Sequence, residues 1–186
     1  MALREVRHTV IRIIRDHLRL SVDPAHSWQG FRFDFTGVTF DGGNFRGARF
    51  SGGTTNFIDA TFSGGTVDFY DARFSGGKVY FIGATFCGHG TTVSFRKAQF
   101  SGGTVDFSKA KFLDSTINFI DTTFSDRGKV SFREAEFSGA TVDFRGATGQ
   151  PPSDLVPPPG EPLPNGLHLP PIWFVTPRPP PGSPAS

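Results

Sequence analysis

Residues 62–74 read FSGGTVDFYDARF, and residues 100–112 read FSGGTVDFSKAKF. Both stretches belong to one longer pattern, in which phenylalanine returns after five or seven residues, once after nine and once after eight. The repeating phenylalanines are Phe35, Phe40, Phe45, Phe50, Phe57, Phe62, Phe69, Phe74, Phe81, Phe86, Phe95, Phe100, Phe107, Phe112, Phe119, Phe124, Phe132, Phe137 and Phe144. A fixed internal period of this kind is typical of a solenoid.

A second regular position lies two residues before nearly every one of these phenylalanines. From Phe50 onward it alternates between a β-branched residue, as at Val67 and Val105, and a mostly small residue, as at Ala72 and Ala110. Two inward side chains at this spacing form a short strand, because side chains alternate between the two faces of a strand. The Gly, Ser and Asp residues between the strands are typical of turns. The repeat therefore predicts short strands joined by tight corners.

The alternation A-x-F then V-x-F, from residue 33 to residue 147, resembles the pentapeptide-repeat family. The resemblance implies an all-β fold, a right-handed four-sided β-helix with a large apolar residue at each repeat centre. This sequence departs from the family in two ways: it uses Phe where the family usually has Leu, and it adds a Gly-Gly pair at alternate corners. We expect these insertions to lengthen each coil from 20 to about 24 residues and to give about five coils over residues 28–147.

Counting four sides per coil predicts four stacks of aromatic rings. A flattened solenoid with about twelve residues per coil is less favourable, because it leaves little room for rings between two sheets at a coil spacing of about 4.8 Å. We number the stacks as sides one to four: Phe35, Phe57, Phe81, Phe107 and Phe132; Phe40, Phe62, Phe86, Phe112 and Phe137; Phe45, Phe69, Phe95, Phe119 and Phe144; Phe50, Phe74, Phe100 and Phe124.

The leader, residues 1–24, predicts an amphipathic helix that ends before Pro24. Its apolar face comprises Leu3, Val6, Val10, Ile13, Ile14 and Leu20, and its basic face Arg4, Arg12, Arg15 and Arg19. We expect the helix to cap the open end of the solenoid over Phe33 and Phe35, together with Trp28. A helix lying on a membrane surface is the less favoured alternative, because Glu5 and Asp16 interrupt the basic face.

The tail, residues 148–186, is rich in proline and is predicted to be partly disordered. The stretch GLHLPPIWF at 166–174 is its main apolar segment. Two alternatives stay open for it: it folds back over the last coil, or it belongs to a loose tail. The stretch PRPPP at 177–181 is similar to a polyproline ligand of SH3-like grooves, a match that is frequent by chance.

Composition argues against several classes of protein. The formal net charge is only +2, which does not favour direct nucleic-acid binding. Cys87 is the single cysteine, so an internal disulfide is impossible and nothing indicates an oxidising compartment. We therefore expect a cytoplasmic protein, and we expect its source to be a bacterium. We expect no transmembrane segment, no cofactor and no metal site: Cys87 and His89 share one widened corner but lack a third ligand. We also expect no catalytic residues, and hence no enzyme.

Outward positions of a solenoid carry its function, since the inward ones are committed to packing. Ile58, Tyr80 and Ile82 are predicted to lie outward around side one, and Tyr70, Arg96, Ile120 and Arg145 around side three. Exposed Ile, Tyr and Arg side chains in proximity are typical of protein interfaces. We therefore expect a scaffold that binds another protein, whose identity the sequence does not reveal.

The alternative function follows from the resemblance, because some pentapeptide-repeat proteins mimic DNA and modulate DNA gyrase. Mimicry of DNA requires a strongly acidic surface in place of phosphates. Residues 28–147 contain 13 Lys or Arg and 12 Asp or Glu, a net charge of +1, and proline-rich sequence replaces the C-terminal dimerisation helix of the gyrase-binding relatives. Both departures count against this alternative.

Overall fold

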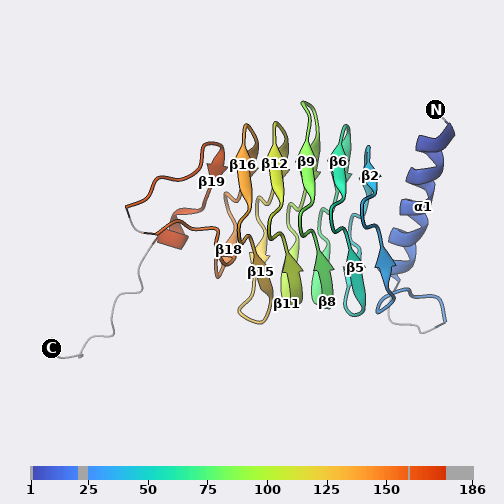
Figure 1. Cartoon of the computed structure of the whole chain (residues 1–186). Helices are drawn as coiled ribbons and strands as arrows, with labels where there is room; N and C mark the ends of the chain where they lie inside the picture. Colours follow the sequence, from blue (N-terminus) through green and yellow to red (C-terminus); the bar gives the residue numbers. More distant parts are fainter. Residues whose placement is uncertain (1, 21–24, 159, 175–186) are drawn as a thin grey trace.

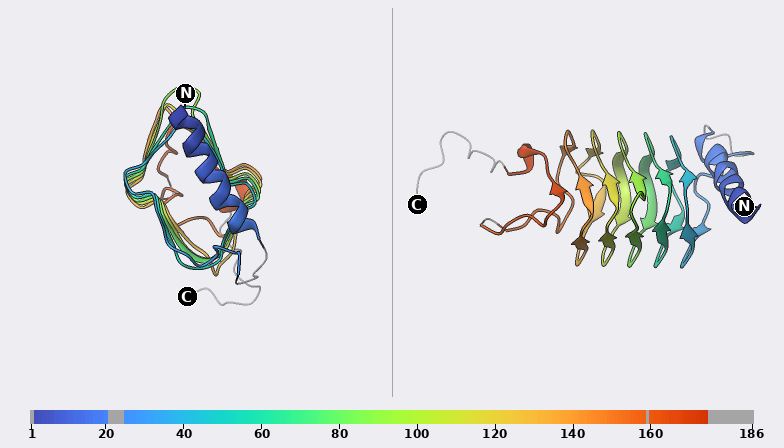
Figure 2. Two further views of the ribbon diagram at one scale, coloured as in Figure 1. Left: turned by 90° about the vertical axis from the view of Figure 1, so that its right-hand side faces the viewer. Right: turned by 90° about the horizontal axis from the view of Figure 1, so that it is seen from above.

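The computed structural model describes residues 2–20, 25–158 and 160–174. The repeat winds into parallel coils stacked along one axis, with helix α1 (Ala2–Arg19) at one end and the C-terminal segment at the other (Figure 1). Viewed along the axis, successive coils superimpose almost completely (Figure 2). The molecule is therefore a rod whose sides are built from equivalent positions of successive repeats.

Three parallel sheets form the sides of the rod. Sides one and four share the largest sheet, because two long strands run through the corner between them: β1 (Phe33–Asp34), β4 (Arg49–Phe50), β5 (Thr54–Asn56), β8 (Arg73–Tyr80), β11 (Gln99–Asp106), β14 (Thr123–Phe124), β15 (Lys129–Ser131) and β18 (Thr148–Gly149). Side two comprises β2 (Thr39–Phe40), β6 (Thr61–Ser63), β9 (Thr85–Cys87), β12 (Lys111–Leu113) and β16 (Glu136–Ser138). Side three comprises β3 (Gly43–Asn44), β7 (Thr66–Asp68), β10 (Thr92–Ser94), β13 (Thr116–Asn118), β17 (Thr141–Asp143) and β19 (Leu167–His168).

The four predicted ring stacks are confirmed. On side one, Phe57 stacks on Phe81 with ring centroids 4.8 Å apart, and Phe81 stacks on Phe107 at 4.7 Å. The other three stacks repeat this arrangement, for example between Phe62 and Phe86 at 4.7 Å. The centroid spacing matches the distance between hydrogen-bonded strands, about 4.8 Å. Each coil therefore places its rings directly on those of the coil below.

The rings of sides one and three also meet across the core. Phe57 contacts Phe69 edge to face at 6.1 Å, and Phe81 contacts Phe95 in the same way at 5.9 Å. Edge-to-face contacts at this distance are favourable for aromatic rings. The small residues two positions before the phenylalanines leave room for these rings. At one such position Thr122 stands in place of alanine, and its hydroxyl donates a hydrogen bond to the carbonyl of Phe95 at 3.0 Å. The core is thus filled by aromatic rings over its full length.

The corners that follow the phenylalanines of sides one and three are type II turns. In each of them the residue two positions after the phenylalanine has a positive φ, as at Asp59 (53°) and Lys109 (59°), and the next residue donates its N–H to the phenylalanine carbonyl. The residue before the phenylalanine often braces the turn: the carboxylate of Asp68 accepts the N–H of Tyr70 at 2.9 Å. The repeat therefore specifies its corners as well as its core.

Helix α1 covers part of the first coil, but not with the predicted face. Ile11, Ile14 and Leu18 are buried, whereas Leu3, Val6, Val10, Ile13 and Leu20 of the predicted apolar face are exposed. Arg4 and Arg7 bond to Asp41, and Gly43 leaves the space in which Ile11 packs. The prediction of the face was therefore wrong except for Ile14.

Trp28 packs at the same end of the rod, where it stacks on His17 and approaches Phe33 with ring centroids 6.3 Å apart. Pro24, the predicted stop, lies outside the described residues.

The C-terminal segment folds back over the last coil. Leu167 is in register with Val142, and the carbonyl of His168 accepts the N–H of Phe144 at 2.8 Å. The 3-10 helix η1 (Pro171–Phe174) then places Trp173 against the rings of Phe124 and Phe144. Of the two alternatives for this stretch, the structure shows the fold-back. PRPPP lies outside the described residues.

Candidate interaction surface

The side-one set, Ile58, Tyr80 and Ile82, forms one small patch. Ile58 and Ile82 occupy the same position in neighbouring coils, because the N–H of Asp59 bonds to the carbonyl of Ile82 at 2.9 Å. Tyr80 precedes the core residue Phe81 and is in register with Asn56 of the coil before it. All three side chains are half-buried. The patch therefore combines apolar and phenolic surface at the carboxyl ends of two paired strands, β5 and β8.

The side-three set forms a ladder with one residue per coil. Its predicted members Tyr70, Arg96, Ile120 and Arg145 each follow a core phenylalanine on side three. Arg46 occupies the same position in the first coil, and its guanidinium lies 4.2 Å from the centroid of the Tyr70 ring. The ammonium of Lys97, from the next coil, lies 5.8 Å from the centroid of the same ring. Tyr70 thus has two cations near its ring, an arrangement favoured by the charge distribution of the ring.

The two sets lie on opposite sides of the rod. Side-one and side-three rings face each other across the core, as Phe81 and Phe95 do, so the outward residues of these sides point in opposite directions. A flat partner can therefore contact one set or the other. The structure unites Ile58, Tyr80 and Ile82, and it unites Tyr70, Arg96, Ile120 and Arg145, but it does not bring the two groups together.

The end of the side-three ladder carries its strongest electrostatic contact. Arg145 binds the carboxylate of Asp143 through Nε and Nη2, the latter at 2.6 Å. Partial burial raises the pKa of Asp143, but the hydrogen bonds from the side chain and backbone of Arg145 outweigh it, and the pKa lies below its ordinary value of 3.8. The same contact raises the pKa of Arg145. This pair stays ionised at neutral pH and fixes the guanidinium at the surface.

A shallow groove of about 320 Å³ joins the first coils of side three to helix α1. Arg15 and Arg19 of the helix line it together with Arg46 and Tyr70. Arg46 was missed at the sequence level, although its place one coil before Tyr70 in the ring register marks it as a member of the same ladder. The side-three ladder therefore continues into a basic groove at one end of the rod.

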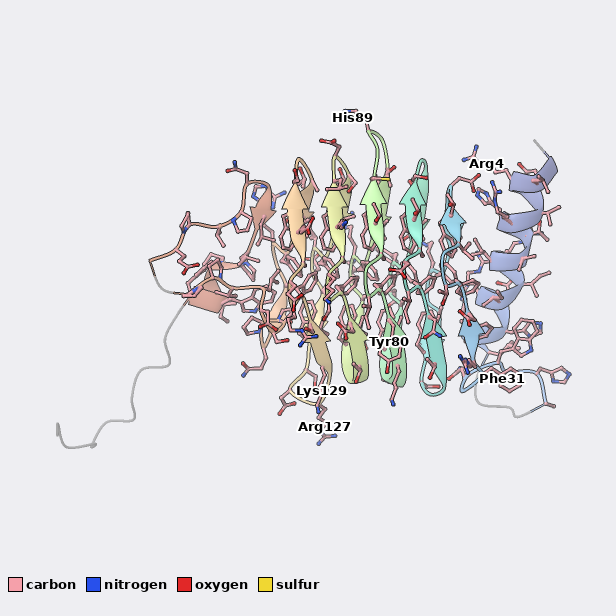
Figure 3. All side chains as sticks on the ribbon, viewed as in Figure 1. Arg4, Phe31, Tyr80, His89, Arg127 and Lys129 are labelled. Carbon is pink, nitrogen blue, oxygen red and sulfur yellow. The ribbon has the colours of Figure 1, made fainter. Side chains whose placement is uncertain are left out.

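The widened corner at Cys87 and His89 projects from the rod, with His89 at its tip (Figure 3). Within the described residues, no group of three or more His, Cys, Asp or Glu side chains is placed to hold a metal ion. In the same part of the chain, no helix is both long enough and apolar enough to cross a membrane. The corner is accommodated as an insertion, with the hydroxyl of Thr91 donating to the carbonyl of Cys87 at 2.7 Å.

Comparison with known proteins identifies the repeat. Residues 35–85 match a family model described as pentapeptide repeats (9 copies). No curated protein sequence has significant similarity to this chain. The matched segment begins at the first ring of side one and ends just before Phe86, so it coincides with the first coils of the solenoid.

Proposed function

Because residues 35–85 match the pentapeptide-repeat model and the same repeat continues through the solenoid, we propose that the solenoid is a rigid, non-enzymatic scaffold that binds another protein through an outward ladder. The observation that carries this proposal is the patch of Ile58, Tyr80 and Ile82, in which backbone hydrogen bonds between coils fix the spacing of three interface-type side chains. Interfaces are enriched in tyrosine and depleted in lysine and acidic residues at their centres.

The rigidity of the surface favours binding. Tyr80 is the last residue of β8, and Ile58 and Ile82 lie in the turns that directly follow Phe57 and Phe81, two fully buried core residues. A preorganised surface loses little conformational entropy on association, which leaves more of the contact energy for affinity. We place the protein in the cytoplasm, where the single thiol of Cys87 suits a reducing compartment.

The experiment is a pull-down from the native cell with a variant that carries Ile58→Ser, Tyr80→Ser and Ile82→Ser. We expect a specific partner to be lost while the melting temperature stays close to that of the wild type, because all three side chains are only half-buried. A matched control carries Thr61→Ser, Thr85→Ser and Lys111→Ser on side two and should retain the partner. Retention of every partner by the side-one variant contradicts this surface.

A second arm distinguishes the scaffold from a DNA mimic. We expect the protein to leave supercoiling by DNA gyrase unchanged, because its repeat region is close to neutral. Inhibition of supercoiling at stoichiometric protein would replace the scaffold proposal with gyrase modulation.

A further inference from the structure

The exposed apolar surface of the rod is concentrated at its two ends. Every large apolar side chain that is exposed in the described part of the chain lies within residues 3–38 or 163–174. At the helical end these are Leu3, Val6, Val10, Ile13, Leu20, Phe31 and Val38, and at the other end Leu163, Ile172 and Phe174. Contiguous exposed apolar surface marks sites of association. The sides of the rod, by contrast, carry their apolar residues inward or half-buried.

Helix α1 leaves part of its own end of the solenoid open. The helix crosses one part of the end face (left view in Figure 2), and Phe35 of the first coil is only half-buried, although Phe57, Phe81 and Phe107 below it are fully buried. Phe31, labelled at this end in Figure 3, is 57% exposed. Val6 and Val10 of the helix are also exposed and add further apolar surface at this end. The end therefore lacks a cover over part of its first coil.

The other end presents a smaller apolar surface. Trp173 points into the solenoid and is 9% exposed, so its neighbours Ile172 and Phe174, at 63% and 52%, face away from the core. The segment that carries them forms the end of the rod opposite the helix (Figure 1). Both ends of the rod therefore carry exposed apolar side chains.

The two ends carry charge of opposite sign. Residues 2–19 contain five arginines and two acidic residues, a net charge of +3, which Asp41 beneath the helix reduces to +2. Residues 148–174 contain Asp154 and Glu161 and no lysine or arginine, a net charge of −2. Arg178 lies beyond the described residues. When it is counted, the net charge of residues 148–186 is −1. Opposite charges favour contact between unlike ends, and like charges disfavour contact between two helical ends or two C-terminal ends.

We propose that the C-terminal end of a second copy covers the helical end, so that rods associate head to tail. A contact of this kind covers one helical end and one C-terminal end, so every internal copy of an assembly has both apolar ends covered, whereas a symmetric dimer covers only one end of each copy. Because the contacting surfaces lie at opposite ends of a straight rod, the contact does not close on itself, and repeated addition produces a linear assembly. This inference is independent of the side-one and side-three surfaces.

The test measures mass in solution by light scattering after size-exclusion chromatography and by sedimentation over a concentration series. We expect the wild-type mass to rise above twice the monomer mass with increasing concentration and to fall when salt is added. Val10→Glu at the helical end and Ile172→Glu at the C-terminal end should each give a monomer. Thr116→Glu, an exposed position midway along side three, adds the same charge and should assemble as the wild type does.

Mixing the two end variants separates head-to-tail association from the symmetric alternatives. Each variant keeps one intact end, so an equimolar mixture should form a dimer and grow no further. Circular dichroism of each variant checks that it is folded. A monomer at every concentration overturns the proposal, and so does a dimer formed by either end variant alone. Equal loss of assembly in Thr116→Glu would show that the association is not specific to the ends.

Discussion

Trp173 donates its indole N–H to the carbonyl oxygen of Gly149 at 3.0 Å. Gly149 is in register with Phe124, where a further phenylalanine would continue side four. A side chain at residue 149 would meet the carbonyl of Phe124, because a Cβ built there lies 1.7 Å from that oxygen. The stack on side four therefore ends at a glycine, and the indole ring covers the last phenylalanine instead.

Trp173→Ala should weaken this end of the rod. Removing a large buried side chain costs about 3–5 kcal/mol, and loss of the hydrogen bond is included in that range. Trp173→Phe should cost less, about 1–2 kcal/mol, because a six-membered ring stays while the five-membered ring and its N–H are lost. Hydrogen exchange read at β17 and β18 checks both variants. Equal exchange in wild type and Trp173→Ala would show that η1 does not stabilise the last coil.

Phe81→Ala should be among the most damaging core substitutions. Phe81 is fully buried and stacks between Phe57 and Phe107, so its removal opens a cavity in the middle of the rod and should cost about 3–5 kcal/mol. Phe81→Leu keeps much of the volume and should cost clearly less, about 1.5 kcal/mol. Urea denaturation measures the loss for each variant. A Leu variant as unstable as the Ala variant would mean that ring stacking, and not volume, decides stability.

Gly103→Ala tests the tight Gly-Gly corners. Gly103 has a positive φ, and a Cβ there would lie 2.2 Å from the carbonyl oxygen of Gly77 in the coil below. Backbone must move, so we expect a loss of more than about 2 kcal/mol. Gly64, in the same motif on another corner, also has a positive φ but has no atom within 4 Å of such a Cβ. Gly64→Ala should cost only about 1 kcal/mol, and thermal unfolding of the pair compares them.

Asp143→Asn should destabilise the protein at neutral pH and not in acid. The folded protein holds the pKa of Asp143 below 3.8, so its carboxylate adds stability above the pKa of the unfolded chain, and this is lost as the pH falls through the folded pKa. An asparagine side chain can still accept the backbone N–H of Arg145, as the side-chain oxygen of Asn118 accepts the N–H of Ile120 at 3.0 Å. It cannot form the ion pair with the guanidinium of Arg145. Melting temperatures from pH 7 to pH 2 should converge for the two proteins.

The ring register was predictable from the sequence because it depends on spacing alone. Phenylalanine every five or seven residues leaves one way to stack nineteen rings on four sides, and Phe57, Phe81 and Phe107 stack as counted. The fold-back of Leu167 had the same signal, since it lies 25 residues after Val142, as Val142 lies after Ile117.

The orientation of α1 was not predictable in this way. A helical wheel finds the most apolar face, but the contact surface is decided by what lies beneath the helix. Here Asp41 forms an ion pair with Arg7, and Gly43 leaves room for Ile11. The helix therefore packs on another face, and the predicted apolar face stays exposed except for Ile14. The register predicts which residues lie outward, such as Tyr70 and Ile82, but their role in binding stays a prediction, because it depends on a second molecule.

The widened corner at residues 87–91 shows how much freedom the rings allow. Despite the extra residues, Phe86 stacks on Phe112 at 4.9 Å and Phe95 stacks on Phe69 at 4.8 Å, and His89 stands between two glycines with positive φ. A short peptide grafted between Gly88 and Gly90 should therefore leave the coil order unchanged. The rod can serve as a display frame, in which a foreign epitope is held at a known height on one edge.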